Sequence, residues 1–286
     1  MTVGIGYEIQ EGRNQLTFHT HSTFELYMLL EGECTFQIGD QFLELQPDDI
    51  VLIDGKTLHK AFVGEESGQY KRTVVHFDRE DIEPVLTTLN QEAILDMFSK
   101  EQGYMYRLKS VADRQRIKGY LADLERISKR DDQTFVQSQS LLLLTQILME
   151  IDSSNLETAK VESQRDIKIT HAESVARYMT LHFKEKIDIA TIAKETNLSP
   201  SYLSHVFKEV TGMTVMTFLM SYRLSQAMFS LRLRTDLQIN EIAKDAGFES
   251  NAHFSRFFKK HVGKTPVQYR KSIQTSHVSS QMDQYL

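Results

Sequence analysis

A chain of 286 residues is long enough for two domains, and its 41 % apolar and 25 % charged residues are the ordinary mix of a globular protein. It contains no apolar run of about 18 residues. Its first residues include no basic or apolar targeting segment, so we expect neither a membrane span nor a signal peptide. The only cysteine, Cys34, excludes an internal disulfide and fits a reducing cytoplasm.

The net charge of −6 is divided unevenly along the chain. Residues 169–272 carry fifteen Lys and Arg against nine Asp and Glu, whereas residues 1–168 carry eighteen against twenty-nine. A basic segment next to an acidic one suggests that only the basic segment meets a polyanion such as nucleic acid. We therefore expect two domains with different functions.

Short strands are predicted for the first part of the chain. Between Leu16 and Phe77, segments rich in β-branched and aromatic residues recur about every 8–12 residues, separated by Gly, Asp and Pro turns. The segments are LTFHTH, FELYMLL, CTFQIG, FLEL, DIVLI and TVVHF. This spacing is typical of an antiparallel barrel or sandwich.

Helical periodicity begins at Arg79 and continues to Asp152, with apolar stripes within 82–89, 117–127 and 135–151. The third stripe has more apolar surface than one helix face needs, so it packs either on the barrel wall or on a second copy of the chain. Residues 153–168 are polar, and we interpret them as a linker. Helical periodicity returns over 169–272, and residues 273–286 are predicted to be a tail.

An internal repeat occupies the C-terminal third of the chain. A shift of fifty residues aligns its first halves, and the shift becomes fifty-one after a turn. The aligned pairs include Ile192 with Ile242, Ser199 with Ser250, Phe207 with Phe258 and Gly212 with Gly263. An offset of one residue confined to a turn is what a duplicated helix-turn-helix unit would show.

Each copy has the residues that such a unit requires. Asn197 and Gly247 tolerate the left-handed conformation of the turn, and Ser199 and Ser250 stand at the N-cap of the second helix. That helix buries apolar residues and presents a polar face, which predicts contacts with double-stranded DNA. The predicted DNA-binding residues are Ser201, Tyr202, Ser204, His205 and Lys208 in the first copy and Asn251, Ala252, His253, Ser255, Arg256 and Lys259 in the second.

These residues resemble the DNA-binding domain of the AraC/XylS transcription regulators. The resemblance covers residues 169–272 and is carried by IATIAKETNLSPSYLSHVFKEVTG, RLSQA and INEIAKDAGFESNAHFSRFFKKHVGKTPVQYR. It implies seven helices, with a long linker helix around Thr217–Leu233. It also implies that the two recognition helices enter successive major grooves on one face of the DNA.

The first half of the chain resembles cupin barrels, which sugar-responsive members of that family carry. His19, His21, Glu25 and Gly32 fit the pattern His-x-His-x3-Glu-x6-Gly, and PDDIVLIDGKTLH ends in His59. The second motif departs from the cupin pattern, because Asp48, Asp54 and Lys56 stand where glycine, proline and glycine are usual.

Three interpretations of this cluster remain open. His19, His21, Glu25 and His59 would hold a divalent ion in a cupin enzyme. Alternatively, the cluster binds a sugar effector, or it is a hydrogen-bond network in a packed barrel. We favour the effector site, because a barrel attached to a DNA-binding domain has something to regulate. The predicted effector-binding residues are His19, His21, Glu25, Tyr27, Phe36, His59, Phe62 and His76.

The sequence therefore predicts an α+β protein that acts as a cytoplasmic, homodimeric transcription activator of carbohydrate uptake or catabolism, without enzymatic activity or cofactor. Its partners would be double-stranded DNA, a sugar such as an α-galactoside, and RNA polymerase. The predicted domains are a cupin-like antiparallel β-barrel over 1–78, a helical dimerisation segment over 79–152, the linker, and an all-α double helix-turn-helix domain over 169–272. Residues Thr2–Gln15 are predicted to form an arm that closes over the ligand.

Overall fold

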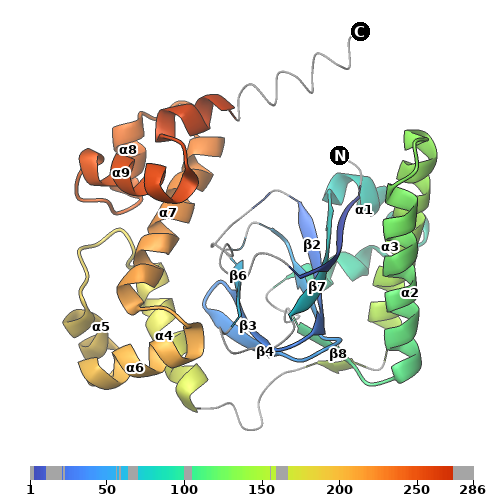
Figure 1. Cartoon of the computed structure of the whole chain (residues 1–286), viewed down its shortest axis with the longest axis horizontal. Helices are drawn as coiled ribbons and strands as arrows, with labels where there is room; N and C mark the ends of the chain where they lie inside the picture. Colours follow the sequence, from blue (N-terminus) through green and yellow to red (C-terminus); the bar gives the residue numbers. More distant parts are fainter. Residues whose placement is uncertain are drawn as a thin grey trace. The chain divides into compact units, whose positions relative to one another are not determined.

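The computed structural model describes residues 3–10, 21, 23–55, 57, 59–63, 70–99, 105–154, 156–158 and 167–272. The chain divides into two compact units, Met1–Thr170 and His171–Leu286 (Figure 1). The first unit is rich in strands and the second is helical, which confirms the predicted fold class. Among the residues described, no helix combines the length and the hydrophobicity that a membrane crossing requires.

Two antiparallel sheets form the core of the first unit. The larger sheet has the order β1-β7-β2-β5-β8-β9, and the smaller has the order β4-β3-β6. The strands are β1 (Gly4–Ile9), β2 (Phe24–Glu31), β3 (Cys34–Ile38), β4 (Gln41–Leu45), β5 (Ile50–Ile53), β6 (His59–Phe62), β7 (Lys71–Phe77), β8 (Met105–Leu108) and β9 (Leu156–Thr158).

The alternation of side chains along β2 divides them between two hydrophobic cores. Tyr27 and Leu29 pack with Phe36 of the smaller sheet, in a core to which both sheets contribute. Leu26 and Met28 point to the other face, where they pack with residues of the helices. Because both faces of the larger sheet are covered, β2 is buried over most of its length.

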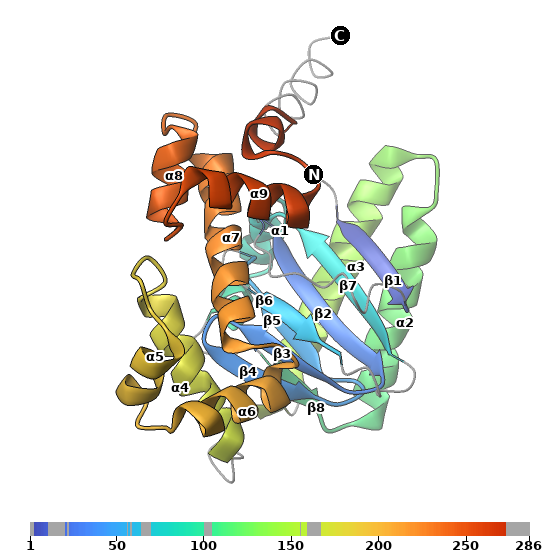
Figure 2. The same ribbon diagram turned by 60° about the vertical axis from the view of Figure 1, so that its left-hand side comes forward.

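Helices cover one face of the larger sheet (Figures 1 and 2). They are α1 (Arg79–Thr88), the 3-10 helix η1 (Glu92–Phe98), α2 (Val111–Ser128) and α3 (Gln133–Ser153). Ser110 and Asp132 cap the N-termini of α2 and α3 with side-chain hydrogen bonds. Leu144 and Leu148 of α3 are fully buried in the core, whereas Leu142 is 55 % exposed. One face of α3 therefore packs on the sheet domain and another remains in contact with solvent.

Three strands correct the predicted organisation. β8 lies within the stretch predicted as helical, and β9 lies within the predicted linker. Both are too short to show a periodicity, and β8 is held beside β5 by the side chains of Arg107 and Asp49, at 2.6 and 2.7 Å. β1 pairs with β7, so residues 4–9 of the predicted arm are an edge strand of the sheet. Of the predicted strand over 16–21, all residues except His21 lie outside the described residues.

The second unit contains seven helical segments within residues 167–272, the number that the family resemblance implied. They are α4 (Ile167–Leu181), α5 (Ile189–Glu195), α6 (Pro200–Thr211), α7 (Val215–Leu233), α8 (Ile239–Asp245), α9 (Asn251–Val262) and a last segment over 266–272. α7 matches the predicted linker helix within two residues. It runs between α5 and α6 at one end and α8 and α9 at the other (Figures 1 and 2).

The two helix-turn-helix units use the same local signals. Asn197 and Gly247 have φ angles of 56° and 80°, as predicted for the two turns. The hydroxyls of Ser199 and Ser250 accept hydrogen bonds from backbone N–H groups three residues later, at 3.3 and 3.2 Å. α6 and α9 then end at glycines in the left-handed conformation. The predicted duplication is therefore confirmed at the level of local structure.

Candidate functional site

α6 and α9 are amphipathic, and each buries one face against its own unit. Phe207 of α6 and Phe254 and Phe258 of α9 are fully buried. The last two pack with residues of α7 and α8 in one core cluster. Phe257 is only half-buried, because its ring lies at the edge of this core against His261.

The residues predicted to contact DNA lie on the opposite faces of these helices. Ser204 and Ser255 are half-buried, and the others are exposed: Ser201, Tyr202, His205, Lys208, Asn251, Ala252, His253, Arg256 and Lys259. Two of them have partners that limit their freedom. Tyr202 Oη lies 3.1 Å from His171 Nδ1 of α4, and the hydroxyl of Ser204 donates to the carbonyl of Pro200 at 2.8 Å.

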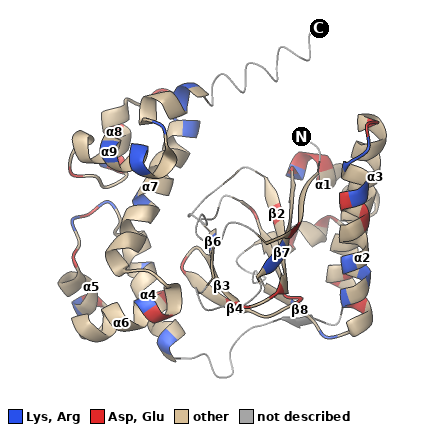
Figure 3. Cartoon of the chain, in the orientation of Figure 1, with Lys and Arg blue, Asp and Glu red and all other residues tan. Residues whose placement is uncertain are grey.

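Positive charge gathers at the end of α9, where Lys259 and Lys260 occupy the last turn (Figure 3). Cations at this position are stabilised by the negative end of the helix dipole. The exposed face of α9 thus combines hydrogen-bond donors near its N-terminus with cations near its C-terminus.

A second cluster of polar residues lies in the first unit and has Glu25 at its centre. Glu25 Oε2 lies 2.8 Å from His21 Nε2, 3.4 Å from His59 Nε2 and 3.7 Å from His76 Nδ1. His76 joins because β2 and β7 pair with Glu25 directly opposite His76. His59 is fully buried, whereas the His76 side chain is 37 % exposed, so solvent reaches the cluster from the His76 side. His19 lies outside the described residues.

The electrostatics of the cluster keep Glu25 ionised. Burial alone would raise the pKa of this carboxyl, but hydrogen bonds with His21 and His59 and the nearby His76 outweigh burial and hold the pKa well below its usual value. Burial lowers the pKa of His76, and the adjacent Glu25 opposes this effect. The result is a buried carboxylate surrounded by three imidazole rings.

Backbone carbonyls orient two of these rings. His21 Nδ1 lies 2.9 Å from the carbonyl oxygen of Thr23, and His59 Nδ1 lies 2.8 Å from that of Thr57. Each contact directs the Nε2 atom of its ring toward Glu25, as in many metal-binding histidines.

Gly55 positions this cluster and was not predicted from the sequence. It has a φ of +73°, and a Cβ atom there would lie 2.0 Å from the carbonyl oxygen of Thr23 and 2.4 Å from His21 Nδ1. The backbone N–H of His21 also donates to the carbonyl of Gly55 at 2.8 Å. Only glycine lets the turn after β5 approach the His21 segment this closely. The available signal was the Asp-Gly pair directly after a predicted strand.

The predicted aromatic lining is divided between two sides of the smaller sheet. The ring of Phe36 stacks on that of His59 at 6.3 Å, and Tyr27 packs on Phe36 at 4.8 Å. Phe62 lies beside Phe42 and Lys60 and alternates along β6 with His59, so it faces the other side. The structure therefore does not bring Phe62 to the cluster, because the two-residue period of the strand separates it from His59.

The cluster has a donor set that fits a metal ion. The ligand atoms of His21, Glu25 and His76 all lie within 4.8 Å of one another. Two imidazole nitrogens and one carboxylate oxygen suit divalent zinc, iron or manganese. The same groups also suit hydrogen bonds to hydroxyl groups, so the arrangement supports either kind of ligand.

Comparison with known proteins gives two domain matches and several relatives. Residues 7–70 match the cupin domain, and residues 192–272 match a helix-turn-helix domain. An uncharacterized HTH-type transcriptional regulator of Bacillus subtilis, YdeC, is 24 % identical over 267 residues, which are 90 % of this chain and 86 % of that protein. The probable transcription factor PqrA of Proteus vulgaris is 38 % identical over 92 residues, 32 % of this chain and 75 % of PqrA.

The arabinose operon regulatory protein of Escherichia coli is 36 % identical over 95 residues, which are 33 % of this chain. The match spans 32 % of that regulator's length. The match therefore spans about a third of each chain.

Proposed function

Because the chain belongs to the AraC family of DNA-binding transcription regulators and carries a cupin domain, we propose that its two helix-turn-helix units bind adjacent major grooves of an operator under the control of a small sugar. The observation that carries this proposal is the duplicated unit. Two helices with the same caps, the same buried face and the same exposed polar face lie at the two ends of α7.

The exposed residues have different proposed roles. Arg256 has the side chain that forms two hydrogen bonds with the major-groove edge of guanine, and Asn251 suits adenine or a phosphate. Lys208 and Lys259 bind phosphates, which adds affinity without sequence information. The smaller side chains, such as Ser201 and Ser255, allow the helices to approach the base edges.

Two substitutions test these roles. Arg256→Ala should weaken operator binding by about 1–3 kcal/mol and relax the preference at one base pair. Lys259→Ala should weaken binding to all sequences equally and reduce the salt dependence. Lys129→Ala, an exposed lysine of the first unit, serves as the control and should change neither. Equal losses on operator and random DNA for Arg256→Ala would show that this residue does not contact a base.

The proposed effector site is the Glu25 cluster. A buried carboxylate accepts hydrogen bonds from sugar hydroxyls, and the imidazoles of His21, His59 and His76 offer donors or acceptors around it. The relative from Escherichia coli is an arabinose operon regulatory protein, which favours a sugar as the effector. An oligosaccharide such as an α-galactoside is the favoured class.

A thermal-shift screen against a panel of sugars tests this site. A sugar present at 100 times its Kd should stabilise the folded chain by about 2.7 kcal/mol and raise the unfolding midpoint. His76→Ala should abolish the shift, whereas Phe62→Ala, on the opposite side of the sheet, should leave it in place. The same shift in both variants would contradict the proposed site.

A second candidate is a divalent ion at the same cluster, which the grouping of His21, Glu25 and His76 favours. Such an ion would supply a Lewis-acidic contact for sugar hydroxyls. We propose a binding role rather than catalysis, because the relatives are named as regulators. Elemental analysis of the purified chain and of His76→Ala distinguishes the two ligands. One equivalent of zinc, iron or manganese that is lost in the variant would support the ion.

We also propose that the chain forms a homodimer through α1 and α3. An apolar groove of about 590 Å³ lies between these helices and is lined by Pro84, Val85, Thr88, Leu89, Leu142, Thr145, Gln146 and Met149. Leu142 and Met149 are one heptad apart, as in helices that pack on a second copy. Leu142→Glu should yield monomers in sedimentation equilibrium, and Gln137→Glu, an exposed position of the same helix, should not.

Sugar binding would then act by shifting the populations of two arrangements of this dimer. We propose that the favoured arrangement recruits RNA polymerase in the cytoplasm and activates genes of carbohydrate uptake or catabolism. A reporter gene placed behind the operator should respond to the sugar identified by the thermal-shift screen. Sugar-dependent repression would contradict the activator role.

A further inference from the structure

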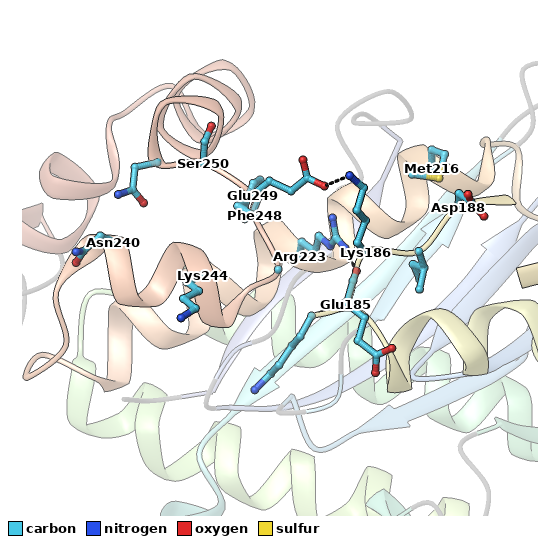
Figure 4. A pocket seen from close by; sticks show the side chains of 14 residues that line it. Glu185, Lys186, Asp188, Met216, Arg223, Asn240, Lys244, Phe248, Glu249 and Ser250 are labelled. Carbon is cyan, nitrogen blue, oxygen red and sulfur yellow. Dashed lines mark hydrogen bonds and ion pairs between the residues drawn. The ribbon is translucent and has the colours of Figure 1, made fainter. Parts of the chain in front are cut away.

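A cleft of about 790 Å³ lies where the two helix-turn-helix units meet beside α7 (Figure 4). One wall is the loop between α4 and α5, which contains Glu185, Lys186 and Asp188. The other wall is the end of α8 and the turn before α9. Lys186 and Glu249 form an ion pair across the cleft at 3.4 Å, but both side chains are largely exposed, so this pair contributes little.

Arg223 of α7 makes the stronger connection. Its Nε donates to the carbonyl of Phe183 at 2.7 Å, and its Nη2 donates to the carbonyl of Glu185 at 2.6 Å. The residue is 8 % exposed. Burial lowers the pKa of Arg223, but a guanidinium remains charged in proteins. A buried cation requires hydrogen-bond acceptors, and the carbonyls that follow the C-terminus of α4 supply two.

Gly247 brings the second helix-turn-helix unit against the same loop. A Cβ atom at this position would lie 2.4 Å from the carbonyl oxygen of Phe183 and 2.9 Å from Arg223 Nε. The turn of the second helix-turn-helix unit therefore touches the backbone of the loop between α4 and α5 directly. Asn197, the equivalent residue of the first helix-turn-helix unit, has the same left-handed conformation with a side chain. The turn itself thus does not require glycine, but the close approach at Gly247 does.

These contacts lie directly before α9 and one helix before α6. The loop held by Arg223 leads through Asp188, the N-cap of α5, into α5 and α6. The turn at Gly247 leads within four residues into α9. We propose that Arg223 and Gly247 are positioning residues that fix the distance and angle between α6 and α9, and thereby set the spacing of the two half-sites that the chain accepts. This inference rests on the proposed binding of both units to one operator.

The consequence for DNA is a preference for spacing rather than for base identity. One inserted base pair moves a half-site by about 3.4 Å and rotates it by about 35° around the duplex. Rigidly connected units then lose the base contacts of one helix, which reduces affinity roughly tenfold or more. Units that can move relative to each other adapt to the changed spacing.

The test uses the full chain and an operator selected from random duplexes with the wild-type protein. Kd is measured for this operator and for versions with one base pair inserted or deleted between the half-sites. Arg223→Lys keeps the charge, but an ammonium group does not reproduce the fork that reaches both carbonyls. Gly247→Asn keeps the left-handed turn and disrupts the close approach. Lys186→Gln, which breaks only the exposed ion pair, is the control.

We expect the wild type and Lys186→Gln to bind the altered operators roughly tenfold or more weakly than the selected one. For Arg223→Lys and Gly247→Asn, the ratio of the Kd for an altered operator to the Kd for the selected operator should fall to about threefold or less. The base preference inside each half-site should stay unchanged. An unchanged ratio in a folded variant, or a wild type without spacing preference, would overturn the inference. If Arg223→Lys does not fold, the ratio for Gly247→Asn decides. Failure of the wild type to select any duplex would instead refute the proposed function.

Discussion

Replacement of Gly55 by alanine is the most direct perturbation of the Glu25 cluster that leaves its polar residues in place. A left-handed conformation costs an L-residue about 1–2 kcal/mol. The new Cβ would also lie 2.0 Å from the carbonyl oxygen of Thr23 and 2.4 Å from His21 Nδ1, so the His21 segment must move. Such overpacking costs a further 1–3 kcal/mol, roughly. We therefore expect Gly55→Ala to lower the free energy of unfolding of the first unit by about 2–5 kcal/mol.

Two other glycines of the same unit separate these contributions. Gly39 has a φ of +58°, and a Cβ atom there would make only an ordinary contact, 3.5 Å from Thr57 Cγ2. Gly39→Ala should therefore lower the free energy of unfolding only by the backbone strain, about 1–2 kcal/mol. Gly119 lies in α2 with nothing within 4 Å, so Gly119→Ala should stabilise the unit by about 0.5–1 kcal/mol.

The assay is urea-induced unfolding followed by circular dichroism, with hydrogen exchange of β2 and β5 to isolate the first unit, because two units need not unfold together. A loss for Gly55→Ala no larger than that for Gly39→Ala would refute the argument from close approach. In that case the turn after β5 would not position His21. Loss of the sugar-induced thermal shift in Gly55→Ala would link the geometry to ligand binding.

Further predictions concern two ion pairs and the buried thiol of the first unit. Arg107→Ala should destabilise the first unit by about 3–5 kcal/mol, because Asp49 would stay buried without its cationic partner. Arg116→Ala removes an exposed ion pair and should cost less than about 1 kcal/mol in the same urea assay. Burial raises the pKa of the Cys34 thiol from 9.0 to about 11. Cys34 should therefore react with iodoacetamide at pH 8 far more slowly in the folded chain than in urea. Because the folded pKa exceeds the unfolded one, this thiol's contribution to stability should be lost as the pH rises from about 9 to about 11.

The helix-turn-helix units could be predicted closely from the sequence, because their signals are local. The N-caps Ser199 and Ser250, the left-handed turn residues and the helical period all act within one or two turns of chain. The duplication added a second copy of each signal, so the assignment of helix starts and turns did not depend on one weak pattern. α7 followed from the family resemblance, which implied a long linker helix around Thr217–Leu233.

The short strands could not be predicted in the same way. β8 and β9 have four and three residues and exist because they pair with distant partners. His76 was named from the sequence, but its place opposite Glu25 depends on the register of β2 and β7. Arg223 looked like an ordinary residue of the linker helix, because its acceptors are carbonyls about forty residues away, and backbone carbonyls carry no sequence signal.

The structure also changes what a deletion of residues 2–15 can report. From the sequence alone, this deletion should abolish the response to ligand and spare DNA binding. β1 is instead a strand of the larger sheet, with Gly4 opposite His76, so the deletion also exposes the edge of β7 beside the cluster. A lost response would then reflect a damaged sheet as readily as a missing arm. Deletion of residues 11–15 alone keeps β1. If the predicted arm covers the ligand, this shorter deletion should abolish the sugar-induced thermal shift, and a shift of unchanged size would contradict the predicted arm.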